Sequence, residues 1–237
     1  MLNETFYLDG VDARSVGIKL QGPITFSEAV PISEAQTIPG RNGDLIWETG
    51  SYENRSGTAS CFCLQKDVEK ALSAAGRFLT AKKGYRRLET SDDPEHFWMA
   101  RVENSPAIEM RMRMLAPFEI GFDCKPQRFL KNGEIPVVID ESGVVLWNEY
   151  GHTALPLITV YGAAPGRLVV GECTVEIRQL NGVIFLDSEV QNAYNNDGNQ
   201  NMNINAPIFP TLKDGETSVS WDGGIERVEI LPRWWEL

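Results

Sequence analysis

Few residues in this 237-residue chain could do chemistry, and the cysteines come first among them. Cys61 and Cys63 flank Phe62 in an apolar run, and alternation along a strand would place both thiols on one face. A zinc site needs Cys-x-x-Cys-type spacing with a second pair of ligands, whereas Cys124 and Cys173 stand alone. The pattern therefore predicts buried thiols that act as small hydrophobic residues.

The histidines and clustered carboxylates are equally sparse. Neither His96 nor His152 lies in a sequence context that matches a known nucleophile arrangement. Asp92, Asp93 and Glu95 could pair as in a glycosidase, but they lie in a hydrophilic turn where solvation explains them. No phosphate-binding loop of the G-x-x-x-x-G-K-[ST] form is present. We therefore expect no enzymatic activity, no cofactor and no metal.

One asparagine-rich stretch could be taken for a calcium loop. Residues 195–199 read Asn-Asn-Asp-Gly-Asn, which gathers oxygen atoms around a glycine turn. An EF-hand loop needs carboxylates at alternate positions and a glutamate at the twelfth, and only Asp197 is acidic here. The stretch therefore predicts a turn.

The net charge of −11 is distributed unevenly along the chain. A short linker, residues 131–136, suggests a division near Gly133. Residues 1–133 hold 17 Lys and Arg against 18 Asp and Glu, a net charge of −1, while residues 134–237 hold 5 against 15, a net charge of −10. An acidic surface repels phosphate, so nucleic acid is not an expected partner; solubility alone also accounts for the acid.

The first half, residues 1–133, predicts strands with one helix. Residues 29–45 look like a loop, because glycine and proline punctuate them. Apolar residues at spacings of three and four predict a helix at about 67–83, with Asp67 as its cap and Gly84 as its stop. Met110, Met112 and Met114 alternate with arginines, which indicates a strand whose methionines face the core or, alternatively, form a binding surface.

The second half, residues 134–237, predicts a β-sandwich or jelly roll. Short apolar runs recur with Gly, Asn, Asp and Pro between nearly all of them. The runs are 136–139, 144–147, 157–161, 167–170, 174–177, 183–186, 218–221 and 226–231. One irregular stretch, residues 189–210, is expected to be a long ordered loop.

Neither export nor membrane insertion is indicated. The first seven residues lack a basic stretch followed by an apolar run, so they do not resemble a signal peptide. No run approaches the ~18 apolar residues that span a bilayer. We expect a water-soluble protein made in a reducing cytoplasm.

Three segments, in order, resemble the distal tail proteins of long-tailed phages and prophages of Gram-positive bacteria. Residues 38–45 are similar to the Pro-Gly-Arg-x-Gly loop found early in that family, and residues 122–126 to the strand end where the family's two domains meet. The third segment runs from Val183 through Phe209-Pro210, Gly215 and Trp221 to the terminal Pro-Arg-Trp-Trp run, which is its most distinctive part. Together the three cover nearly the whole chain.

The resemblance implies a mainly β protein without enzymatic activity. Its amino-terminal β domain with one helix (1–133) would build a hexameric ring, and a galectin-like β-sandwich (134–237) would project from it. The ring would join the tail tube to the tail-tip protein at the virion tail tip and could mount receptor-binding proteins. The near-zero charge of the first half fits this role, since six copies must come into contact there.

Arg41, Asn42 and Asp44 are the candidate assembly contacts. They lie in a glycine-flanked loop, where opposite charges could pair across a repeating head-to-tail interface. The alternative is that Gly40 and Gly43 only satisfy turn geometry and the charges are solvated.

The tryptophans leave a second function open. Trp234 and Trp235 are expected as core and edge residues that close the sandwich, with a sugar platform as the alternative. The chain could then act as a monomeric carbohydrate-binding module that attaches to the host surface, which glycan binding by residues 134–237 would support. A tail-associated hydrolase is a third class, and it would need a cleft with perturbed carboxylates.

Overall fold

The computed structural model describes residues 4–64, 68–103 and 115–237. The chain divides into two compact units, one up to Arg128 together with Leu237, and one from Phe129 to Glu236. The sequence interpretation put the division at residue 133, within the short 3-10 turn η2 (Lys131–Glu134). The fold is mainly β, as predicted.

One antiparallel sheet forms the body of the first unit. Its strand order is β2-β1-β8-β9-β10-β7-β3, with β4 also paired to β7. The long strands β7 and β10 pair from Leu115 opposite Leu64 to Cys124 opposite Arg55. The strands are β1 (Phe6–Leu8), β2 (Val11–Asp12), β3 (Ile18–Leu20), β4 (Thr25–Phe26), β7 (Arg55–Leu64), β8 (Arg86–Thr90), β9 (His96–Val102) and β10 (Leu115–Leu130).

Alternation along these strands builds the first core. Cys61 and Cys63 are both fully buried on one face of β7, as the sequence predicted. The Phe6 ring packs edge-on against Phe122 at 5.8 Å and lies 6.3 Å from the ring of Phe78. Cys124 is buried as well, and Cys173 of the second unit is partly buried. The four thiols therefore pack as hydrophobic side chains rather than as ligands or disulfides.

The predicted helix is confirmed as α1 (Val68–Thr80), the one α-helix of the described residues. Its side chains Ala75, Phe78 and Leu79 are buried in the core of the first unit. The helix ends at Thr80, before the expected stop at Gly84. Near this end the buried Arg86 donates a hydrogen bond from Nη1 to the Phe78 carbonyl at 2.8 Å. A cation at the last carbonyls satisfies groups that the helix leaves unpaired. The expected cap Asp67 and the methionine run 110–114 lie outside the described residues.

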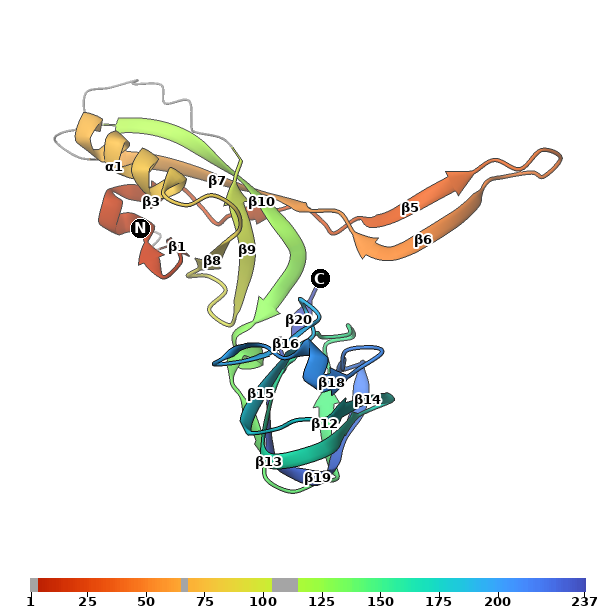
Figure 1. The fold of residues 1–237 in the computed structure, drawn as a ribbon. Coiled ribbons are helices and arrows are strands. Elements are labelled where there is room, and N and C mark those ends of the chain that lie inside the picture. The colour runs from red at the N-terminus through yellow and green to blue at the C-terminus, as the bar shows by residue number, and fades with distance from the viewer. Residues whose placement is uncertain (1–3, 65–67, 104–114) are drawn as a thin grey trace. The chain divides into compact units, whose positions relative to one another are not determined.

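A separate two-stranded ribbon belongs to the first unit, and we call it the arm. It consists of β5 (Pro31–Gln36) and β6 (Leu45–Tyr52), paired antiparallel and joined through residues 37–44. In Figure 1 it stands clear of the other strands of this unit. The expectation of a loop over 29–45 was therefore wrong for β5. The chain is extended there, but every β5 residue is exposed, so no alternation of apolar and polar residues marks the strand.

The second unit is one curled antiparallel sheet. Its main order is β11-β19-β13-β15-β16-β17, with β12 on β19, β14 on β13, and β18 on β14. The strands are β11 (Val137–Ile139), β12 (Val144–Asn148), β13 (Leu157–Val170), β14 (Cys173–Ile177), β15 (Gly182–Asp187), β16 (Asn192–Asn195), β17 (Gly198–Asn199), β18 (Ile204–Asn205) and β19 (Gly215–Leu231). The last strand of the chain, β20 (Trp235–Glu236), pairs with β10 and is not part of this sheet. Short 3-10 turns are η1 (Ala13–Val16) in the first unit and η3 (Asn201–Asn203) in the second.

Two long strands, β13 and β19, fold this sheet into a sandwich. Their register shifts between Tyr161 and Gly166. A Cβ added at Gly162 would lie 2.2 Å from the Gly224 carbonyl oxygen, and one added at Gly166 would lie 2.6 Å from the Asp222 carbonyl oxygen. Glycine lets the two backbones approach closely at the bend. Each strand can therefore contribute to both layers.

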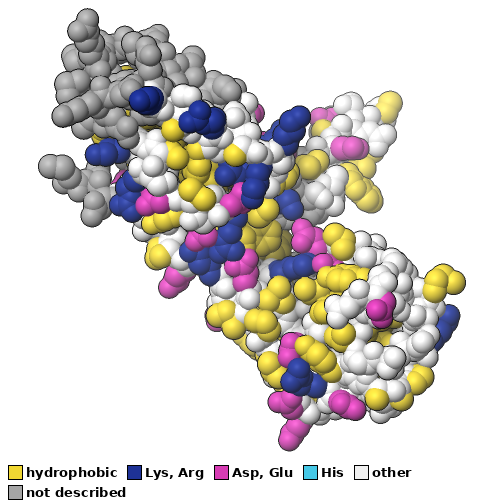
Figure 2. Space-filling view, turned by 60° about the vertical axis from the view of Figure 1, so that its left-hand side comes forward, with side chains coloured by type: hydrophobic (Ala, Val, Ile, Leu, Met, Phe, Trp, Pro, Cys, Tyr) yellow, Lys and Arg dark blue, Asp and Glu magenta, His cyan; other side chains and the backbone are white. Residues whose placement is uncertain are grey.

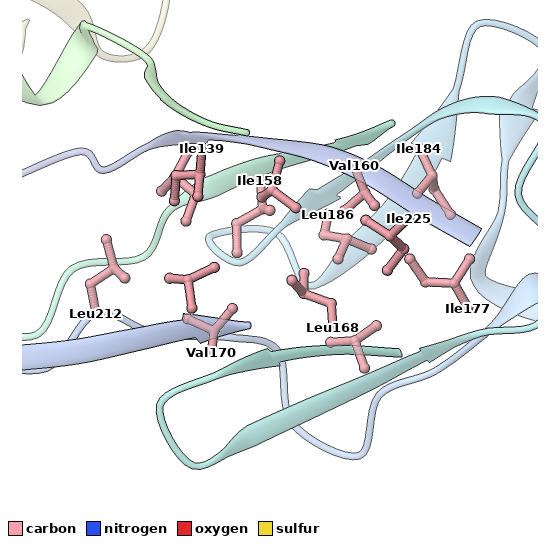
Figure 3. Close-up of a cluster of buried hydrophobic side chains, with 14 of the residues drawn as sticks. Ile139, Ile158, Val160, Leu168, Val170, Ile177, Ile184, Leu186, Leu212 and Ile225 are labelled. Carbon is pink, nitrogen blue, oxygen red and sulfur yellow. The ribbon is translucent and has the colours of Figure 1, made fainter. Parts of the chain in front are cut away.

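Apolar side chains fill the space between the layers. Figure 3 shows Ile158, Val160, Ile184, Leu168 and Val170 converging from the two halves. All five are buried. The sandwich predicted for the second half is thus confirmed.

The carboxy-terminal run is anchored within the second unit. The Arg233 N–H donates to the Gly133 carbonyl at 2.8 Å, and the Leu130 N–H donates to the Trp234 carbonyl at 2.9 Å. Trp234 is buried in the core, and Trp235 stacks on His152 at 4.3 Å. The expectation of core and edge residues is met: Trp234 is buried, and Trp235 is partly buried with His152 against one face of its ring.

The charge asymmetry is visible on the surface. On the face drawn in Figure 2, Lys and Arg side chains are frequent over the first unit and sparse over the second. No helix among the described residues is long and apolar enough to cross a membrane.

Candidate assembly site

The arm tip holds all three candidate contact residues, Arg41, Asn42 and Asp44. The Arg41 N–H donates to the Ile38 carbonyl at 3.1 Å, which closes a turn. Gly40 and Gly43 have φ of 84° and 81°, in the left-handed region that favours glycine. The glycines therefore do serve turn geometry, as the alternative interpretation held.

The three side chains differ in what they are free to do. Asp44 accepts a hydrogen bond from the Thr37 hydroxyl at 2.7 Å, so one of its oxygens holds the tip together. Arg41 and Asn42 are exposed, and their side chains have no partner in the described part of the chain. Arg41 and Asn42 can therefore bind a neighbour, whereas Asp44 first of all shapes the loop.

The flanks of the arm present apolar side chains to solvent. Ile46 and Trp47 are 66% and 69% exposed on opposite faces of β6. Across the ribbon they oppose Ala35 and Glu34. An isolated two-stranded ribbon is marginally stable in water, because it has no layer to pack against. The described residues therefore leave these apolar side chains uncovered, and the sequence did not predict this because it does not show which residues are exposed.

A rigid base carries the arm. The Phe26 and Trp98 rings stack at 4.3 Å, and the Arg55 Nε donates to the Ser27 carbonyl at 2.6 Å. A Cβ at Gly57 would lie 3.0 Å from the Phe26 ring, so glycine lets the ring lie flat on β7. The arm thus leaves the sheet from fixed points on two strands.

A carboxylate-lined pocket of about 380 Å³ lies at this base. Asp123 in it already pairs with Arg101 at 2.5 Å. The side chains of Glu28 and Glu53 have no hydrogen bond or ion pair with a described residue, and Glu103 interacts electrostatically with Arg101. The pocket therefore retains negative charge that could attract a cation from another molecule. Its lining is Ser27, Glu28, Val30, Glu53, Asn54, Ser56, Glu103 and Asp123.

The residues considered for catalysis lie in structural contacts. His96 Nδ1 lies 2.6 Å from Asp93 Oδ1, and Arg128 Nη1 lies 3.4 Å from Asp93 Oδ2. His152 stacks on Trp235. No group of three or more His, Cys, Asp or Glu among the described residues is arranged to hold a metal ion.

The asparagine stretch is a turn, as predicted. The Asn195 Oδ1 accepts hydrogen bonds from the N–H groups of Asp197 at 2.9 Å and Gly198 at 3.1 Å. The stretch 189–210, expected as one ordered loop, also contains β16, β17, η3 and β18. Its asparagines bond to one another, as in the 2.7 Å bond from Asn199 Nδ2 to Asn192 Oδ1.

Comparison with known proteins finds similarity in structure. No family model and no curated protein sequence matches the chain. Among solved structures, the Dit protein (gp 19.1) of phage SPP1 is similar with a TM-score of 0.74 at 15% sequence identity, over 97% of this chain and 98% of that chain. That protein is described as a paradigm of the hub adsorption apparatus in phages that infect Gram-positive bacteria. The chain thus has the fold of a phage distal tail protein across both units.

Proposed function

We propose that this chain is a structural hub protein of a phage tail tip, a distal tail protein that assembles into a hexameric ring. The support comes from a match in fold that spans nearly the full length of both chains, so that two successive units agree in order. A single β-sandwich is shared by unrelated functions, whereas a two-unit arrangement is more specific. We propose no catalytic role.

The arm is the proposed contact between copies. It exposes apolar side chains on a ribbon that has little stability by itself, and a neighbouring copy would cover them. Contacts that repeat head to tail close into a ring when the rotation permits. Arg41 and Asn42 at the tip would then reach the next copy.

The carboxylate-lined pocket is the proposed acceptor for Arg41. Arg41 at the tip is positive and the carboxylates at the base are negative, so Arg41 of one copy and the base of the next are complementary in charge. Asp123 is paired with Arg101, which leaves Glu28, Glu53 and Glu103 to receive the incoming guanidinium. This arrangement repeats without change around a ring.

The proposed partners follow from the role. The ring would join the tail tube to the tail-tip protein, and receptor-binding proteins could attach to it. The protein would be made and assembled in the host cytoplasm and end at the tail tip of the virion. The second half, with a net charge of −10, is not suited to bind nucleic acid.

The mass of the purified chain in solution tests the proposal. Light scattering over a range of concentrations, alone and with the adjacent tail-tip protein, should give a particle of about six copies in at least one condition. A variant with residues 32–51 replaced by a short Gly-Ser turn should stay below that mass while its two units remain folded. A chain that stays monomeric in both conditions would refute the ring.

A further inference from the structure

A second pocket lies in the second unit, far along the chain from the arm. It has a volume of about 210 Å³ and is bounded by the loop before β15 and by the asparagine-rich turn. Amide side chains dominate its wall. The lining is Gln179, Asn181, Val183, Ile184, Asn195, Asp197, Gln200 and Asn203.

One wall of this pocket is fixed before any ligand arrives. Gln200 Nε2 donates to Asn195 Oδ1 at 3.0 Å, and Asn203 Nδ2 donates to Gln200 Oε1 at 2.5 Å. The Arg178 N–H donates to the Asn203 carbonyl at 2.7 Å, which ties the turn to the end of β14. Because these amides hold one another, their orientation costs little entropy on binding.

The opposite wall of the pocket carries side-chain amides that are available for hydrogen bonds to a ligand. Gln179 and Asn181 are exposed, and their amides have no partner among the described residues. Leu180 between them is buried in the core, so the loop that carries both amides is anchored. Each free amide offers an acceptor oxygen and two donor hydrogens.

The chemistry of the lining selects a neutral, hydroxylated ligand. An amide can both donate to and accept from a hydroxyl group, and a hydroxyl group does the same in return. None of the described lining residues is Lys or Arg, and Asp197 would repel a phosphate or carboxylate. The partly buried Val183 adds one apolar contact suited to the C–H face of a ring, while Ile184 beside it is buried in the core.

The size of the pocket limits the ligand to one ring. At about 30 Å³ per water molecule, 210 Å³ corresponds to roughly seven waters. Pockets for larger organic ligands begin at about 300 Å³. We propose that this pocket binds a single neutral sugar ring, such as one residue of a cell-surface glycan, between the free amides of Gln179 and Asn181 and the fixed amides of the turn.

Saturation-transfer NMR on the full chain tests the site. The probes are glucose, galactose, rhamnose and N-acetylglucosamine at up to about 10 mM, with glucuronate and glucose 6-phosphate as anionic counterparts. Transfer to at least one neutral sugar, and weaker transfer to the anionic ones, is the expected result. No transfer to any neutral sugar, or a preference for an anion, would overturn the proposal.

Two variants locate the binding. The double variant Gln179→Ala with Asn181→Ala should weaken the binding of the sugar at least about tenfold, because two hydrogen bonds to the sugar are lost. The double variant should keep its thermal midpoint, since both side chains are exposed and neither makes a hydrogen bond to a described residue. Asn196→Ala is the control, an exposed amide of the same turn that does not line the pocket. Equal binding by the double variant and the native chain would overturn the assignment, while ring formation, which uses the arm, would be unaffected.

Discussion

Arg233 and Asp187 form a two-pronged ion pair inside the second unit, with Nη1 to Oδ1 at 2.7 Å and Nη2 to Oδ2 at 3.0 Å. Asp187 ends β15, and Arg233 lies just before β20. The pair therefore links the terminal segment to the sandwich. Burial by itself would raise the pKa of Asp187, but hydrogen bonds from Arg233 and from backbone N–H groups bring that pKa below its ordinary value.

Asp187→Asn should destabilise the protein by about 2 to 3 kcal/mol, measured by urea unfolding. Removing the carboxylate leaves a largely buried guanidinium whose one remaining acidic partner among the described residues is Glu189, at 3.4 Å. Asp222→Asn is the matched control, because it breaks the exposed Arg167–Asp222 pair and should change the free energy of unfolding by less than about 0.5 kcal/mol. Equal effects of the two changes would mean that the buried pair is no anchor.

The same pair predicts a dependence on pH. A carboxyl whose pKa is lower in the folded than in the unfolded state stabilises the fold above its unfolded pKa, about 3.9, and loses this contribution as pH falls through the folded pKa. The stability difference between the native chain and Asp187→Asn should therefore be constant near neutrality and shrink below about pH 4. Urea unfolding from pH 7 down to pH 3 measures it, and a difference that grew in acid would contradict the sign.

The sandwich was predictable because its strands alternate, but its bend was not. Leu157–Tyr161 and Arg167–Val170 read as two strands, because Gly162, Pro165 and Gly166 between them look like a turn. In the structure they are one strand, β13, whose glycines lie against those of β19. Sequence periodicity marks where a side-chain pattern stops, and it does not tell a bend within a strand from a turn between two strands.

The candidate assembly site shows a different limit. Arg41, Asn42 and Asp44 were correctly placed together in a tight loop, since glycines and a proline set turn geometry locally. The strands on either side of the loop pack against no core, so their sequences do not alternate between apolar and polar residues. For this reason the sequence predicted a loop where the structure has β5. The contacts that Trp47 and Arg41 make with another molecule stay a prediction.

Gly162→Ala should cost several kcal/mol or prevent folding of the second unit. The new Cβ would lie 2.2 Å from the Gly224 carbonyl oxygen and 2.7 Å from Leu180, so backbone and core must both move. Gly76→Ala, the same substitution in α1 with no atom within 4 Å of the new Cβ, should instead stabilise its helix by about 1 kcal/mol. Circular dichroism during thermal unfolding distinguishes them, and a neutral Gly162→Ala would show that the bend does not depend on glycine.

Thiol reactivity should separate the cysteines. Burial raises the pKa of Cys61 and of Cys124 to about 12, so almost no thiolate forms at pH 8. Cys173 is partly buried and should react first with a chromogenic disulfide reagent, with the others following only in denaturant. Mass spectrometry of the labelled peptides identifies each site. Rapid native labelling of Cys61 would contradict its burial in the core.

Charge reversal tests the proposed contact between arm tip and base. Arg41→Glu should weaken association about tenfold or more, because it brings a carboxylate to a pocket that already holds Glu28, Glu53 and Glu103. The fold should be retained, since the Arg41 side chain is exposed and makes no hydrogen bond or ion pair with a described residue. Lys19→Glu is the control, an equal change of charge on an exposed β3 residue away from the arm. Sedimentation of both variants over the same concentrations measures the effect.

Adding the opposite reversal identifies the acceptor. Glu53→Arg alone should also weaken assembly, because it lowers the negative charge of the pocket and places a cation where Arg41 would bind. Arg41→Glu together with Glu53→Arg should restore much of the loss, because the two side chains can then pair in the reverse sense. Rescue requires that the two side chains meet across copies, since a general effect of net charge would cancel in Lys19→Glu with Glu53→Arg as well. If the double variant assembles no better than Arg41→Glu, the tip binds another surface. If Arg41→Glu leaves the particle mass unchanged, Arg41 does not take part in the interface.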